Sequence, residues 1–170
     1  SYNPSTGKYD LNAWDSTFWT QIRNEISHAA SHGINVHLAI MDGCNLRLDG
    51  DSNPYLHSFW NPANHVTPYY ADPDLDHDNI IDEINEFYQT TAFNNNTGIG
   101  YYQKKLIDKT IAECDGYSNV FYEVSNESHG ANATWYSAVS SYIKSKTGKA
   151  VTLNENHSTD MVSQADGYCR

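Results

Sequence analysis

The segment of residues 119–153 constrains the fold of this chain more than any other, because it joins two strand patterns through one helix pattern. Both of its ends are short runs rich in branched or aromatic apolar residues, as in buried strands. Between them, Trp135, Val139 and Ile143 recur at the spacing of one helix face. A helix that crosses between neighbouring strands makes those strands parallel. The segment therefore predicts a parallel sheet covered by helices.

The N-terminal part of the chain predicts another helix and another strand. The helix ends at Gly33 and is marked by apolar residues three and four positions apart, which are Trp14, Phe18, Ile22, Ile26 and Ala29. The alternating run at 34–41 follows as a strand. Further helices are predicted near residues 80–88 and 102–114, and the start of a last strand is predicted at 165–169.

This alternation predicts an α/β fold with parallel strands near residues 34–41, 119–124 and 149–154. We expect one domain over residues 1–170, with a long polar loop at about 43–79. A doubly wound sheet and a (β/α)8 barrel both fit, and both bind ligands at the carboxyl ends of their strands. No glycine-rich phosphate-binding motif follows a strand, which disfavours nucleotide-binding versions.

The charge balance narrows the classes of partner. The 170 residues contain 10 Lys and Arg against 21 Asp and Glu, which gives a formal net charge of −11. An acidic surface repels phosphate groups, so we expect neither nucleic acid nor an anionic membrane surface as a partner. The longest apolar run, residues 34–41, is too short to cross a bilayer.

The cysteine pattern excludes two further classes. Cys44, Cys114 and Cys169 are too few and too far apart for a disulfide scaffold or a CxxC site, and at most one bridge could form among them.

A high content of Tyr and Asn, few Lys and two N-glycosylation patterns favour an extracellular location. Acidic residues at alternate positions from Asp72 imitate a calcium loop, but His77 stands where that loop needs glycine. We therefore predict no metal and no cofactor.

Polar residues stand where the predicted strands end. Asp42 ends the first strand, Asn126 and Glu127 follow the second, and Glu155 and His157 follow the third. Parallel strands place their carboxyl ends at one edge of the sheet, so we expect these side chains to surround one opening, or mouth, at that edge. An acidic mouth with many aromatic neighbours suits an uncharged polyhydroxylated ligand.

Several of the residues that stand out in the sequence also have a structural interpretation, as an alternative to a role in ligand binding or catalysis. Glu127 could simply stabilise the N-terminus of the following helix. Trp60, in the long loop, could stack on a sugar face or anchor that loop in the core. His37 and Glu123 lie within strands, where we expect a satisfied core histidine and a buried carboxylate with a basic partner.

Residues 8–12, the stretch 29–42 and above all the segment 119–127 resemble the cellulase-like glycoside hydrolases of clan A. This resemblance implies a (β/α)8 barrel, of which the chain would supply about the third to fifth strands and the start of the sixth. It also implies that Glu127 is the general acid/base of a retaining glycosidase, and that Asn126 bonds a hydroxyl group of the sugar.

A complete barrel of this kind takes about 250 residues, so the resemblance implies an incomplete barrel without the strand that carries the nucleophile. The expected substrate-binding residues are Asn126, Asp42, Trp60, His129, Glu155 and His157. The leading hypothesis is a secreted hydrolase of O-glycosidic bonds in a polysaccharide or oligosaccharide, with that carbohydrate as its partner. The alternative is a non-catalytic carbohydrate-binding or structural subunit that assembles with other chains or with the remainder of a barrel.

Overall fold

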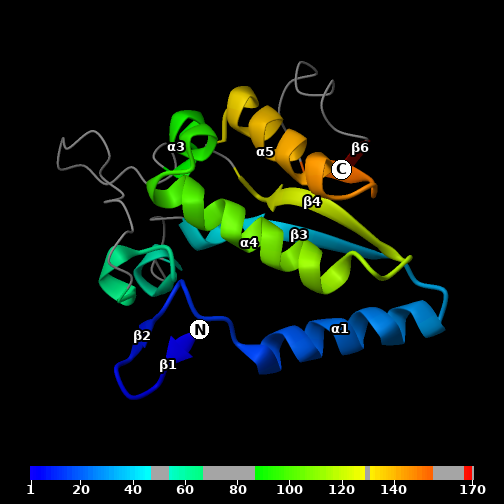
Figure 1. Cartoon of the computed structure of the whole chain (residues 1–170), viewed down its shortest axis with the longest axis horizontal. Helices are drawn as coiled ribbons and strands as arrows, with labels where there is room; N and C mark the ends of the chain where they lie inside the picture. Colours follow the sequence, from blue (N-terminus) through cyan, green and yellow to red (C-terminus); the bar gives the residue numbers. More distant parts are fainter. Residues whose placement is uncertain (47–53, 67–86, 129–130, 155–166, 170) are drawn as a thin grey trace.

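The computed structural model describes residues 1–46, 54–66, 87–128, 131–154 and 167–169. Within these residues the chain forms a mixed α/β fold with a four-stranded parallel sheet and a separate two-stranded antiparallel hairpin (Figure 1). The prediction of a parallel sheet flanked by helices is therefore confirmed.

The parallel sheet has the order β3-β4-β5-β6, which is also the order of its strands along the chain. Its strands are β3 (Val36–Asp42), β4 (Val120–Asn126), β5 (Val151–Asn154) and β6 (Gly167–Cys169). The strands expected from the sequence are all present, with their ends shifted by about one or two residues, as is usual for such boundaries.

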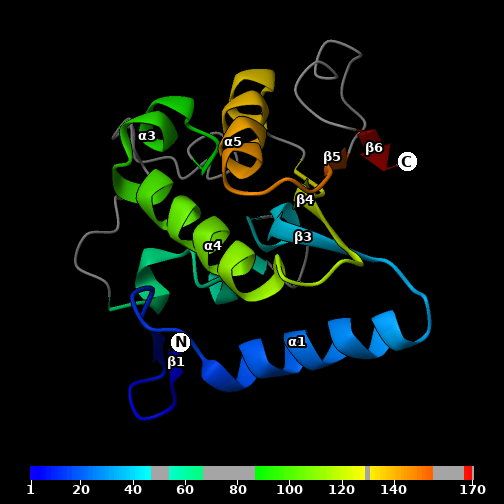
Figure 2. The ribbon, with the colours of Figure 1, turned by 45° about the vertical axis from the view of Figure 1, so that its right-hand side comes forward.

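Helices lie on one face of this sheet and along its edge at β3. They are α1 (Ser16–Ser31), α3 (Thr90–Asn95), α4 (Gly98–Cys114) and α5 (Ala133–Lys146). Figures 1 and 2 show α4 and α5 on the same face of the sheet, with α1 running along the side where β3 lies. The hairpin pairs β1 (Tyr2–Asn3) with β2 (Lys8–Tyr9) next to the start of α1.

Local sequence explains both ends of α1. Asp15 is the N-cap residue, and its carboxylate accepts hydrogen bonds from two amides of the first turn at 2.8 and 3.1 Å. At the other end Gly33 has a φ of 69°, and its amide and the next one donate to carbonyls of the last turn. This left-handed ending is the one that a glycine in this position predicts. Trp14, which the spacing placed in the helix, lies just before it.

The core lies between the sheet and helices α4 and α5. Large apolar side chains of these elements have no exposed surface, and they include Ile107, Tyr122, Val124, Trp135, Val139, Ile143 and Val151. Burying a side chain of this size stabilises the fold by roughly 1.5–3 kcal/mol. The spacing of Trp135, Val139 and Ile143 therefore predicted the helix face that packs on the sheet.

Several elements were not expected from the sequence. The hairpin was missed, and so was α3, whose Thr and Asn residues have low intrinsic helix propensity. Phe93 of α3 is buried and packs edge-on against Tyr142 of α5 at 5.7 Å, which supplies the tertiary contact that a short helix needs.

The predicted polar loop at 43–79 contains three short 3-10 helices in its described parts. These are η1 (Gly43–Leu46), η2 (Pro54–His57) and η3 (Pro62–Asn64). The rest of that loop and most of the helix predicted near residues 80–88 lie outside the described residues.

Close packing of α3 against α4 gives a test of the fold. A methyl group on Gly100 would lie closer than 3.0 Å to backbone atoms of Ala92 and Phe93. We expect Gly100→Ala to lower the free energy of unfolding by about 1–3 kcal/mol, because two backbones must separate, although alanine favours helices. Urea unfolding measures the change, and Gly148→Ala is the control, since nothing lies within 4 Å of its added methyl. A Gly100→Ala protein as stable as the control would contradict this packing.

Candidate functional site

The carboxyl ends of β3 and β4 bring two of the predicted site residues together. The register of the two strands sets Asp42 opposite Asn126. The side-chain amide of Asn126 donates a hydrogen bond from Nδ2 to Oδ1 of Asp42 at 3.3 Å. The expectation that these strand ends meet is therefore confirmed for this pair.

Asp42 organises the turn that follows β3. Its Oδ1 also accepts a hydrogen bond from the backbone amide of Cys44, and its Oδ2 accepts one from Nδ2 of Asn45, both at 3.1 Å. Three donors thus hold this half-buried carboxylate in one orientation. A carboxylate bound in this way is suited to positioning other groups, since its oxygens are already engaged.

Glu127 follows β4 in an uncommon backbone conformation. Its φ is 46°, in the left-handed region that residues other than glycine rarely adopt. Its carboxylate Oε2 accepts a hydrogen bond from Sγ of Cys44 at 3.0 Å. Non-glycine residues in such conformations are enriched at functional sites, where the surrounding structure holds them in place.

Gly43 allows the two strand ends to approach this closely. An added methyl group there would lie closer than 3.0 Å to the backbone of Glu127 and Ser128.

Tyr88 is buried at the same end of the sheet. Burial raises the pKa of its phenol, and a hydrogen bond with Ser128 acts in the opposite direction. The phenol therefore stays neutral.

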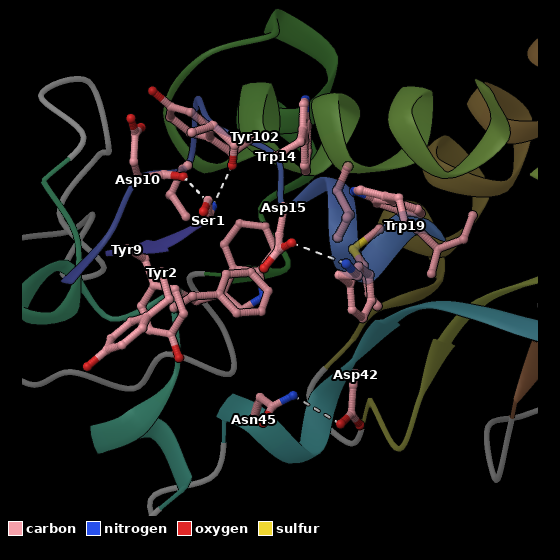
Figure 3. Close-up of a pocket in the computed structure, with 18 of the residues that line it drawn as sticks. Ser1, Tyr2, Tyr9, Asp10, Trp14, Asp15, Trp19, Asp42, Asn45 and Tyr102 are labelled. Carbon is pink, nitrogen blue, oxygen red and sulfur yellow. Dashed lines mark hydrogen bonds between the residues drawn. The ribbon is translucent and has the colours of Figure 1, made fainter. Parts of the chain in front are cut away.

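A cavity of about 690 Å³ opens beside this cluster. Its polar end is formed by Asp42, Asn45 and Asn126. The rest is mainly aromatic and comes from the hairpin, the turn before α1, α1 itself, the long loop and α4. These residues are Tyr2, Tyr9, Trp14, Phe18, Trp19, Phe59, Trp60 and Tyr102. Figure 3 shows labelled aromatic side chains of the hairpin, α1 and α4 around the cavity, with Asp42 and Asn45 at one end.

The positions of the predicted site residues differ. Asp42, Asn126 and Trp60 line the cavity, whereas Glu127 is next to the cluster and does not line the cavity. His129, Glu155 and His157 lie outside the described residues.

Trp60 anchors the long loop in the core, which is one of the two interpretations that the sequence allowed. It is 4% exposed and packs edge-on against Phe87 at 5.1 Å, as an anchor of its loop would. It also contributes to the wall of the cavity. Packing therefore holds its ring in place at the wall of the cavity.

The strand residues His37 and Glu123 form a structural pair, as expected. Nε2 of His37 lies 3.1 Å from Oε2 of Glu123 and 2.7 Å from Oγ1 of Thr152. The ring of His37 stacks on Phe121 with a centroid distance of 4.5 Å, and burial lowers the pKa of His37. The buried carboxylate of Glu123 thus has the basic partner that the sequence predicted.

Some residues of the site were missed by sequence analysis. The hairpin residues Tyr2 and Tyr9 line the cavity, although they precede every predicted element. Asn45 and Cys44 contact the predicted carboxylates directly. Their position immediately after Asp42 was the one available signal.

Among the described residues, no group of His, Cys, Asp and Glu side chains is placed to hold a metal ion. The calcium-like segment that begins at Asp72 lies outside them. No described helix combines the length and the apolar character that a bilayer span requires. No family model, curated protein or solved structure matches the chain in comparisons with known proteins.

Cys44 and Cys114 differ in burial, and this difference gives a test of the site. Cys114 is completely buried and its pKa is raised to about 11, mainly by burial, so its reactive thiolate is scarce near neutral pH. Cys44 is only partly buried. We expect iodoacetamide to modify Cys44 and to leave Cys114 unmodified in the folded protein, as read by mass spectrometry of peptides. A urea-denatured sample is the control, and faster labelling of Cys114 than of Cys44 in the folded protein would contradict the placement of these thiols.

Proposed function

We propose that the chain is part of a glycoside hydrolase of the (β/α)8 type, with Glu127 as the general acid/base. The observation that supports this most is the junction of β3 and β4, where Asp42 and Asn126 meet beside Glu127. This junction lies at the carboxyl ends of parallel strands, where barrels of this type bind their substrates. An aromatic cavity adjoins it, and aromatic faces suit the apolar faces of sugar rings.

Each residue of the junction has a role in this proposal. The bond from Asn126 to Asp42 orients the amide, which then bonds a sugar hydroxyl next to the scissile bond. Protonated Glu127 donates its proton to the glycosidic oxygen as a second carboxylate attacks the anomeric carbon and the bond from that carbon to the oxygen breaks. The carboxylate of Glu127 then takes a proton from the water that attacks the anomeric carbon and releases the second carboxylate.

Cleavage with retention also needs a second carboxylate about 5 Å from the first. Asp42 fits that role poorly, because three protein donors already engage its oxygens. Glu155, the other carboxylate that the sequence offers at a strand end, lies outside the described residues. The nucleophile therefore has no assignment in this proposal.

A second candidate function is carbohydrate binding without catalysis. The specific observation that favours it is that the cavity contains Asp42, Asn126 and eight aromatic residues, yet not Glu127. In both cases we propose an extracellular protein whose partner is a carbohydrate. Among the described strands β3 forms one edge of the sheet, and this edge would suit assembly with further strands, from the same or another chain.

Substitution of Glu127 tests the catalytic proposal. We expect Glu127→Gln to reduce release of reducing sugars by about 100-fold or more, because an amide cannot donate the proton that the leaving oxygen needs. The assay uses wild-type protein against glucans, xylans, mannans and arabinans. Glu25→Gln, which makes the same change on the exposed surface of α1, is the control and should keep full activity.

The same experiment separates the two candidate functions. Three tryptophans line the cavity, so intrinsic fluorescence reports oligosaccharide binding independently of turnover. Binding in the absence of any hydrolysis by the wild-type protein would favour the non-catalytic function. Full turnover by Glu127→Gln would remove Glu127 from the mechanism.

A further inference from the structure

The charges around the aromatic cavity are strongly one-sided. Three acidic residues line it, Asp10, Asp15 and Asp42. Among the described lining residues there is no Lys, Arg or His, and the one positive group is the amino group of Ser1, which the charges of Asp10 and Asp15 attract. The excess of negative charge agrees with the net charge of −11 and favours ligands that carry positive charge.

These carboxylates are held in place by the local backbone. Asp15 uses Oδ1 for both of its bonds to the first turn of α1, and Asp10 uses Oδ1 to accept a bond from the amide of Asn12 at 2.8 Å. In Asp10 and Asp15 one carboxylate oxygen thus orients the side chain, and the negative charge of the carboxylate stays beside the cavity. Figure 3 shows Asp10 and Asp15 near Tyr102 and Trp14.

The aromatic part of the wall strengthens the preference for a cation. Tyr2, Trp14 and Phe18 are 51%, 38% and 50% exposed, so their ring surfaces are accessible to a ligand. The face of an aromatic ring attracts ammonium groups, and a carboxylate nearby adds to that attraction. The same faces bind the apolar side of a sugar ring.

The chain itself places two ammonium groups against rings of this cavity. Nζ of Lys109 lies 5.6 Å from the ring centroid of Trp19, and Nζ of Lys105 lies 5.6 Å from that of Tyr102. Neither lysine lines the cavity, and Lys109 is paired with Glu113. The negative charge of the lining carboxylates is therefore only partly compensated.

We propose that this cavity binds saccharides that carry protonated amino groups, in preference to uncharged or acidic saccharides. The sugar rings would stack on the exposed aromatic side chains while the ammonium groups contact Asp10 and Asp15. This inference rests on the proposed carbohydrate function and specifies its ligand: the uncharged sugar expected from the sequence is replaced by an amino sugar.

A matched series of ligands tests the preference. It consists of β-1,4-linked oligomers of glucosamine, N-acetylglucosamine and glucose of equal length, titrated against the wild-type protein with tryptophan fluorescence. At about pH 5.5, above the reference titration range of carboxyl groups, we expect the glucosamine oligomer to bind about tenfold more tightly than the other two. Added salt should reduce that ratio, because partly exposed charges are screened.

Two substitutions assign the preference to the cavity. Asp10→Asn and Asp15→Asn remove the charges but retain a side-chain oxygen for the backbone bonds, and Asn is as good an N-cap as Asp. The double variant should lose most of the preference for glucosamine and still bind the glucose oligomer. Glu25→Gln changes the net charge outside the cavity and should leave the preference intact. Thermal unfolding confirms that each variant is folded.

Several results would overturn the inference. Equal binding of the three oligomers would do so while leaving the proposed hydrolase in place, since Glu127→Gln tests turnover separately. Equal loss of preference in Glu25→Gln and in the double variant would attribute it to net charge rather than to the cavity. Equally tight binding of an oligolysine of the same charge would show that the sugar is not recognised. If no oligomer binds, the carbohydrate function that the inference rests on fails with it.

Discussion

The parallel pairing of β3 with β4 is the interaction on which the candidate site depends. Its register sets Asp42 opposite Asn126, and Gly43 lets the chain after β3 contact the backbone of Glu127. A slip of one residue would turn every side chain of one strand to the opposite face. The apolar residues that face α4 and α5 therefore fix, through the same register, which polar groups meet at the strand ends.

The site combines two kinds of surface that come from distant parts of the chain. The polar junction is made by the last residues of two adjacent strands, Asp42 and Asn126, so their separation follows from the geometry of the sheet. The aromatic wall comes from the hairpin, α1, α4 and the long loop. In the proposed function, the charge on that wall would select among sugars, and the junction would supply the chemistry. The two can therefore be altered separately by substitution.

Periodic parts of the fold were predictable from the sequence, and the aromatic cavity was not. Val139 and Ile143 recur on one face because they pack on the sheet, and Asp42 and Asn126 could be paired because parallel strands end at one edge. Tyr2 carries no such periodic signal, since its place depends on how a short hairpin folds back beside α1. The contact of Cys44 with Glu127 depends on a left-handed backbone at Glu127, which tertiary packing imposes.

Strand order that follows chain order has a consequence for how the protein acquires its structure. Each strand pairs with the one just before it in the chain, but the pairing of β3 with β4 closes the longest segment, from 43 to 119. Closing a loop costs conformational entropy before the contacts that compensate for it can form. We therefore expect the pairing of β3 with β4 to form more slowly than the pairings of β5 and β6.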